Sequence, residues 1–179
     1  MSHTDYLISF IKANNIKRIA EVGVYKGKCY REILRQCTEI EEYWGIDRYT
    51  AYNDPSFAMG CKTQDEWDSI YLRNCFDMTF FPQLKIVKGE SITISKFWNK
   101  PYFDLVFIDA DHRKEYVLAD IFAWKPLVKR FLSGHDYGKG HSKGHRVEEA
   151  VNEIFTKEQI KLAKNGIWYV EIEGKNLLP

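Results

Sequence analysis

The stretch from Tyr102 to His112, YFDLVFIDADH, constrains the possible folds of this chain more than any other. Its centre, Leu105–Ile108, is continuously apolar and lacks the polar alternation of a strand with one face in water. This pattern predicts a strand buried on both faces, as in the middle of a parallel sheet covered by helices. Asp109, Asp111 and His112 then follow the strand. Because ligands bind at the carboxyl ends of strands in open α/β sheets, these side chains are candidates for chemistry.

Asp109 and Asp111 also have a purely structural interpretation, as caps of the helix that follows. For Asp111 both interpretations stay open. Asp109 lies closer to the buried strand, where a carboxylate without a partner is costly. A functional role is therefore expected first for Asp109.

After a first helix, the α/β unit begins with a strand, a glycine turn and a helix, predicted at Arg18–Val22, Gly23–Lys28 and from Cys29 onward. Nucleotide-binding α/β folds begin in this way, because glycines let the backbone approach a ligand and the helix offers free N–H groups. The turn reads Glu21-x-Gly23-x-x-x-Gly27 and departs from the GxGxxG of dinucleotide-binding proteins. A carboxylate at Glu21 would repel a pyrophosphate and suits a ligand with an ammonium group. An ordinary structural turn explains this motif equally well when it is taken alone.

A second strand is predicted at Tyr43–Asp47, and it ends in an acid roughly twenty residues after the glycine turn. A carboxylate at that place can bind both hydroxyls of a ribose. Asp47 could instead cap the next element. The preceding glycine unit favours the ribose role.

An insert at about residues 48–80 separates the second strand from the third. It contains a turn signal at Asn53–Ser56 and a helix predicted from Thr63, with Trp67 and Tyr71 at helical spacing. Segments in this position often form the wall or lid of a ligand site. Packing of the helix on the outer face of the sheet is the alternative.

The rest of the chain continues the alternation of strands and helices. The expected elements are a helix at Thr4–Asn14, a strand at Gln83–Gly89, a short helix carrying Phe97 and Trp98, a helix at Glu115–Lys125 with Tyr116, Val117, Ile121 and Phe122 inward, a strand ending near Asp136, a helix at Arg146–Phe155, and strands at Lys161–Lys164 and Gly166–Glu173 joined at Asn165-Gly166. The glycine- and lysine-rich segment Lys139–His145 is a candidate mobile flap.

Composition places the chain among ordinary globular proteins. Its 179 residues suit one domain, with 45% hydrophobic and 28% charged residues. A formal net charge of +1 gives no electrostatic argument for nucleic acid or an anionic membrane as partner. The chain has four cysteines, and no two of them form a CxxC pair. They are Cys29, Cys37, Cys61 and Cys75. Without a leader-like segment, reduced thiols and a cytoplasmic location are expected.

Taken together, five motifs in order resemble the class I S-adenosylmethionine-dependent methyltransferases, in their small-molecule O-methyltransferase-like branch. The motifs are Glu21–Gly27, Gly45–Asp47, Lys88–Ser91, Phe103–His112 and Gly134–Tyr137. The resemblance implies a single domain over residues 1–179 with an α/β, Rossmann-like, doubly wound fold. Its seven-stranded sheet would be mostly parallel with an antiparallel last strand.

The resemblance also implies where S-adenosylmethionine would bind. Glu21 would face the methionine end, Asp47 the ribose, and Glu90 with Ser91 the adenine. The full implied set of cofactor-binding residues is Glu21, Gly23, Tyr25, Gly27, Asp47, Glu90, Ser91 and Asp109.

Metal-dependent relatives in this branch hold a divalent cation with an Asp at the position of Asp109 and an Asp-Asn pair where this chain has His135-Asp136. Asp109, His135 and Asp136 are therefore candidate ligands for Mg²⁺ or another divalent cation. His135 departs from the pattern and favours a softer ion or no metal. The relatives' catalytic lysine corresponds to His112, whose ordinary pKa suits a general base. His135 is the alternative base, and helix capping is the alternative role for His112.

The expected function is methyl transfer to the oxygen of a small hydroxylated acceptor, sugar-like or a natural product, by in-line attack on the sulfonium methyl. The expected partner is a small-molecule substrate, with no nucleic acid, no membrane, and a possible homo-oligomer. A non-catalytic binding or partner protein with the same fold is the alternative. A nicotinamide-dependent oxidoreductase is disfavoured by the missing GxGxxG and by Glu21.

Overall fold

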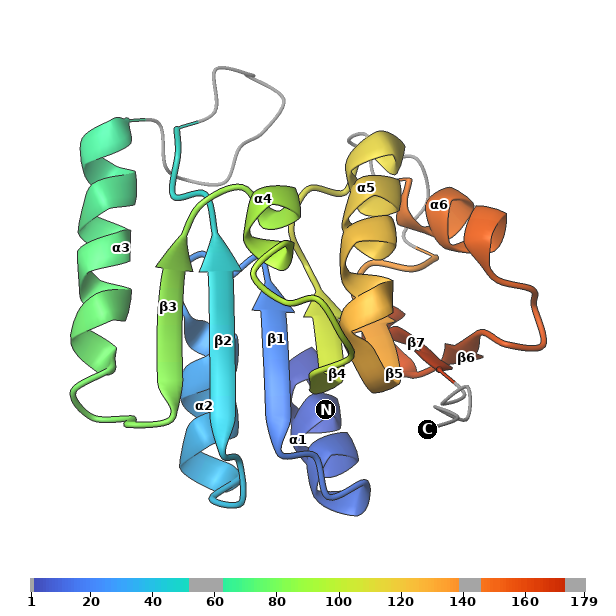
Figure 1. Ribbon diagram of the computed structural model, residues 1–179, viewed down its shortest axis with the longest axis horizontal. Coiled ribbons are helices and arrows are strands. Elements are labelled where there is room, and N and C mark those ends of the chain that lie inside the picture. The colour runs from blue at the N-terminus through green and yellow to red at the C-terminus, as the bar shows by residue number, and fades with distance from the viewer. Residues whose placement is uncertain (1, 52–62, 139–145, 173–179) are drawn as a thin grey trace.

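The computed structural model describes residues 2–51, 63–138 and 146–172, and it has a central sheet between two layers of helices (Figure 1). The strands are β1 (Arg18–Val22), β2 (Glu42–Asp47), β3 (Leu84–Lys88), β4 (Phe103–Ile108), β5 (Val128–Gly134), β6 (Lys161–Leu162) and β7 (Trp168–Glu171). The helices are α1 (His3–Ala13), α2 (Lys28–Gln36), α3 (Gln64–Asp77), α4 (Ser91–Ser95), α5 (Lys114–Trp124) and α6 (Val147–Ile154), with short 3-10 turns at Lys125–Leu127 and Lys164–Gly166.

The seven strands form one sheet in the order β3-β2-β1-β4-β5-β7-β6. Strands β1 to β5 pair in parallel, β7 runs antiparallel to β5, and β6 runs antiparallel to β7. The chain reverses between β6 and β7 at Asn165 and Gly166, whose φ angles of 65° and 77° suit a tight turn. This arrangement confirms the predicted doubly wound, mostly parallel sheet and the terminal hairpin.

The core lies on both faces of the sheet, as the apolar stretch predicts. Along β4, Leu105 and Phe107 pack in the cluster that includes α1, α2 and α3. Val106 and Ile108 pack in the cluster on the other face, with α4, α5 and α6. In Figure 1, α4 and α5 lie in front of the sheet, while α1 and α2 lie behind it. The strand order reverses beside β1, so the carboxyl ends of β1, β2 and β4 open a crevice there.

The predicted insert contributes α3 beside the edge strand β3 (Figure 1). This helix begins at Thr63, which forms a capping box with Glu66, and its Trp67 is buried in the core. Residues 52–62 of the insert and the predicted flap at 139–145 lie outside the described residues.

Two local predictions are wrong. Helix α4 ends at Ser95, so Phe97 and Trp98 follow this helix and do not lie on it. In α5, Val117, Ile121 and Trp124 are buried, but Tyr116 and Phe122 are 40% and 66% exposed. The buried residues share one face at helical spacing, and Tyr116 and Phe122 fall outside that face.

Three cysteines belong to the described residues, Cys29, Cys37 and Cys75, and all three are free thiols. No helix in the described ranges has the length and apolar character needed to span a membrane.

Candidate active site

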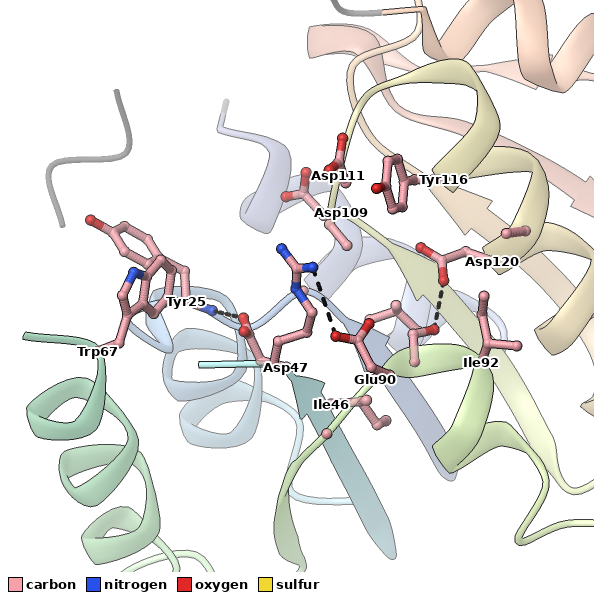
Figure 2. A pocket seen from close by; sticks show the side chains of 17 residues that line it. Tyr25, Ile46, Asp47, Trp67, Glu90, Ile92, Asp109, Asp111, Tyr116 and Asp120 are labelled. Carbon is pink, nitrogen blue, oxygen red and sulfur yellow. Dashed lines mark hydrogen bonds and ion pairs between the residues drawn. The ribbon is translucent and has the colours of Figure 1, made fainter. Parts of the chain in front are cut away.

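A cleft of about 780 Å³, partly open to solvent, lies at the carboxyl ends of β1, β2 and β4 (Figure 2). Helices α3 and α5 and the start of α4 contribute to its walls. Six of the eight predicted cofactor-binding residues line it: Gly23, Tyr25, Asp47, Glu90, Ser91 and Asp109. The topology thus brings together residues that are far apart in the sequence. Gly23 and Asp109, which share one wall, are 86 positions apart. That Gly23 and Asp109 meet here follows from the pairing of β1 with β4.

Gly23 is required at its position by a close approach of two backbones. Its φ is 94°, and a Cβ atom there would lie 2.2 Å from the Asp109 carbonyl oxygen. Its N–H donates to the Ile46 carbonyl over 2.8 Å. The glycine therefore lets the turn after β1 lie directly against the ends of β2 and β4.

Asp47 fixes the conformation of this turn. Its Oδ2 accepts hydrogen bonds from the backbone N–H groups of Val24 and Tyr25, at 3.0 and 2.8 Å, and its Oδ1 accepts one from Tyr49 at 2.9 Å. Figure 2 shows the bond from Tyr25. A carboxylate has about four acceptor positions, so three backbone donors leave acceptor capacity for a ligand. The predicted ribose role of Asp47 stays a prediction, and the structure adds a role in positioning the turn.

Glu21 and Gly27 lie outside the cleft lining. Glu21 is 1% exposed and accepts a hydrogen bond from the Tyr43 hydroxyl at 3.0 Å. Burial raises the pKa of Glu21 to about 8, although hydrogen bonds from Tyr43 and Cys29 act to lower this pKa. Gly27 precedes α2 with a φ of 70°, and a Cβ atom there would meet the Tyr30 ring. The predicted contact of Glu21 with the methionine end stays a prediction, while Gly27 is explained by the packing of α2.

The strand ends also hold four side chains that we call the acid–histidine cluster: Asp109, His112, His135 and Asp136. His112 Nε2 lies 3.4 Å from Asp109 Oδ1 and 3.1 Å from Asp136 Oδ2. His135 Nδ1 lies 2.9 Å from Asp136 Oδ1 and 3.5 Å from Asp109 Oδ1. A fifth residue, His3 of α1, packs its ring 4.7 Å from that of His135. His3 was missed by the sequence analysis because nothing in α1 itself indicates this contact.

Mutual pairing sets the charges of the cluster. Burial would raise the pKa of Asp109, but hydrogen bonds to His112 and His135 lower it to about 2. Burial would lower the pKa of His135, but hydrogen bonds to Asp109 and Asp136 raise it to about 9. His135 is therefore an imidazolium at neutral pH and is unsuited to act as the general base. Of the two predicted bases, His112 is the one that these contacts favour.

The cluster does not fit the divalent-cation site implied for Asp109, His135 and Asp136. Both histidines direct a ring nitrogen at the carboxylates, within 3.5 Å. Mg²⁺ takes oxygen ligands, and His135 is instead held by the two carboxylates that would have to bind the ion. Across residues 2–51, 63–138 and 146–172, no group of three or more His, Cys, Asp or Glu side chains is placed to hold a metal ion.

The remaining acids of the cleft have different partners. Asp111 accepts from the backbone N–H of Arg113 at 3.0 Å and pairs with its guanidinium at 2.6 Å, so it lines the cleft and also stabilises the start of α5. Glu90 pairs with Arg48 at 3.7 Å. Ser91 Oγ donates to Asp120 Oδ1 over 2.6 Å. The sequence analysis missed Asp120, although an acid at helical spacing with the inward Val117 and Trp124 was a usable signal.

The methyltransferase-domain family matches residues 20–137, which is more than half of the chain. The comparison with curated protein sequences finds no match.

Solved structures share the fold at low sequence identity. A Klebsiella pneumoniae protein assigned as an O-methyltransferase has a TM-score of 0.69 at 13% identity, covering 96% of this chain and 81% of that chain. A Staphylococcus aureus protein assigned as a caffeoyl-CoA O-methyltransferase has a TM-score of 0.65 at 17% identity, covering 96% and 82%. Spermidine synthase from Thermotoga maritima has a TM-score of 0.55 at 16% identity, covering 88% and 53%. At these identities the similarities show the fold alone.

The matched residues include all five sequence motifs, and the match ends at the last residue of the fifth, Tyr137. They also include Gly23 and Asp109, which line the cleft. The chain belongs to the methyltransferase-domain family, and it is a class I S-adenosylmethionine-dependent methyltransferase.

Proposed function

We propose that the chain transfers a methyl group from S-adenosylmethionine to a hydroxyl oxygen of a small polyhydroxylated acceptor, sugar-like or a natural product. The observation that carries this proposal is the position of the acid–histidine cluster at the edge of the cleft. Asp109 lines the cleft and also a small second pocket beside it, lined by His112 and His135, with room for about one water molecule. A cofactor in the cleft and an acceptor at the cluster would meet at Asp109.

His112 is the proposed general base. His112 takes the proton of the acceptor hydroxyl, and two carboxylates face its Nε2. The resulting imidazolium is stabilised by Asp109 and Asp136 at 3.4 and 3.1 Å. When bound, S-adenosylmethionine supplies an electrophilic methyl group on a sulfonium, and S-adenosylhomocysteine is the product.

Preference for a polyhydroxylated acceptor is supported by the polar groups of the cluster. Two carboxylates and the His135 imidazolium offer both acceptors and donors within a few ångströms. A sugar-like molecule can form further hydrogen bonds with several of these groups at once, whereas a flat apolar ring can form none. Two structural neighbours are assigned as O-methyltransferases by name, which agrees with transfer to oxygen.

The experiment is a methyl-transfer screen with isotopically labelled S-adenosylmethionine and a panel of polyols, sugars, phenols and amines. The site of methylation in each product is assigned by fragmentation in the mass spectrometer. We expect label on a hydroxyl oxygen of a polyhydroxylated acceptor. Turnover confined to amines or to phenols would contradict the proposed acceptor class, and cofactor binding without transfer to any acceptor would favour the non-catalytic alternative.

A further inference from the structure

We propose that Asp120 selects the cofactor by accepting a hydrogen bond from the exocyclic amino group of its adenine. This inference rests on the proposed use of S-adenosylmethionine. Asp120 belongs to α5, lines the cleft, and is only 6% exposed. In Figure 2 its carboxylate lies on the α5 side of the cleft, away from Tyr25 and Trp67.

A chain of two hydrogen bonds fixes Asp120 as an acceptor. Trp124 Nε1 donates to Ser91 Oγ over 2.7 Å, and indole nitrogen is a donor only. Ser91 Oγ then directs its own hydrogen at Asp120 Oδ1, 2.6 Å away (Figure 2). The Ser91 hydroxyl is thereby used within the protein. The predicted contact of Ser91 with adenine is better assigned to Asp120, which Ser91 orients.

Asp120 differs from the other acids that line the cleft, because it has neither a charged hydrogen-bond partner nor several partners. Asp47 is bound by three backbone N–H groups, Asp111 by Arg113, and Glu90 by Arg48. Within the described part of the chain, Asp120 has one hydrogen bond, from a neutral hydroxyl, and its Oδ2 has no donor. A carboxylate on a side chain that is only 6% exposed is poorly hydrated, so a ligand that supplies an N–H from the cleft would be stabilised.

The surroundings of Asp120 suit a flat, neutral donor better than a cationic group. Apolar side chains line the same cleft as this acid, and they include Ile46, Ile92 and Ala119, with the aromatic ring of Tyr116. In Figure 2, Asp47 and Asp120 lie on different sides of the cleft, with Ile46 and Ile92 also in the lining. If Asp47 binds the ribose, a purine extending over the apolar residues brings its 6-position toward Asp120. An amino group there donates to Oδ2, whereas a 6-oxo group would present lone pairs to a carboxylate.

The test compares the binding of S-adenosylhomocysteine with that of S-inosylhomocysteine, which carries oxygen in place of the amino group. Both are titrated calorimetrically into the wild-type protein, Asp120→Asn and Glu115→Gln at pH 7.5. Asp120→Asn keeps an oxygen for Ser91 and turns an amide N–H toward the cleft. Glu115→Gln makes the same chemical change on an exposed residue of the same helix.

For the wild type and Glu115→Gln we expect S-adenosylhomocysteine to bind at least about 100-fold more tightly than the 6-oxo analogue. Asp120→Asn should reduce this ratio at least tenfold or invert it. Ser91→Ala, which removes the hydroxyl that orients Asp120, should reduce the ratio severalfold and serves if the first variant does not fold.

Two failures can be told apart. If S-adenosylhomocysteine binds the wild type but the ratio is the same in Asp120→Asn, Ser91→Ala and Glu115→Gln, the role of Asp120 is overturned and the proposed cofactor stands. If S-adenosylhomocysteine does not bind the wild type, both the proposed function and this inference are overturned.

Discussion

Asp109 and Asp120 are two buried or partly buried acids in one cleft, and their environments affect them in opposite ways. Burial disfavours the charge of both carboxylates. At Asp109, two histidines overcome this effect and lower its pKa to about 2, whereas at Asp120 a single serine hydroxyl does not, and its pKa rises to about 6. The charge of Asp109 is thus compensated within the protein, while that of Asp120 depends on a donor from elsewhere. The first environment suits proton handling, and the second suits ligand recognition.

The largest expected effect is on catalysis at the acid–histidine cluster. His112→Gln removes the proposed base and keeps a polar side chain near Asp109 and Asp136. The rate of methyl transfer should fall about 10²- to 10⁴-fold, while the affinity for S-adenosylhomocysteine stays within about twofold. Single-turnover experiments measure the rate of methyl transfer, and calorimetric titration measures the affinity for S-adenosylhomocysteine. An unchanged rate would show that His112 is not the base. The acid–histidine cluster would then have only a binding role, like Asp120.

A smaller effect is expected on stability at high pH. His135 has a folded-state pKa raised from 6.5 to about 9, so its contribution to stability is complete below pH 6.5 and is lost as the pH rises through about 9. Its size is on the order of 3 kcal/mol at pH 6. The difference in free energy of unfolding between the wild type and His135→Gln should therefore shrink between pH 7 and pH 10. Urea titrations across that range measure it, and a constant difference would contradict the charged state assigned to His135.

In the ligand-free protein, the fold favours the neutral form of Asp120, whereas it favours the charged form of His135. Its folded-state pKa is raised from 3.8 to about 6, so the associated stability is present below pH 4 and is lost as the pH rises through about 6. Asp120→Asn should then be more stable than the wild type at pH 8, by up to about 2 kcal/mol, and this gain should vanish toward pH 4. Thermal unfolding at several pH values tests this. A variant less stable than the wild type at pH 8 would show that Asp120 already has a compensating partner.

The smallest expected effect is that of metal removal. Because the cluster does not fit a divalent-cation site, methyl transfer should change less than about twofold on treatment with EDTA or on addition of Mg²⁺. Activity lost in EDTA and restored by Mg²⁺ would mean that His112 and His135 move away from the carboxylates when the metal binds. In that case the metal, as well as the histidines, would keep the Asp109 carboxylate ionised.

The sequence was sufficient to predict elements whose pattern is local. Leu105–Ile108 predicted a strand buried on both faces, and Gly23 predicted a turn in which backbones approach closely. The position of the cleft followed from the order of these elements, since parallel strands end at one edge of the sheet.

Contacts between side chains that are distant in the sequence could not be predicted. The hydrogen bond of Ser91 to Asp120 spans 29 positions, and the contact of His3 with His135 joins the first helix to the fifth strand's end. Likewise, the pairing of both histidines with Asp109 depends on side-chain geometry that the motifs do not specify.

Calorimetric titration of S-adenosylmethionine into the wild type, Asp47→Ala and Asp104→Ala, all in EDTA, tests the central claim most directly. Asp104 is the matched control because its Oδ2 also accepts two backbone N–H groups, those of Lys17 and Arg18 at 2.9 and 3.0 Å, near the opposite end of the strands. We predict one cofactor per chain, bound with an affinity on the order of micromolar by the wild type and Asp104→Ala and lost in Asp47→Ala. Absence of binding to the wild type, or equal binding to Asp47→Ala, would contradict the cleft as the cofactor site.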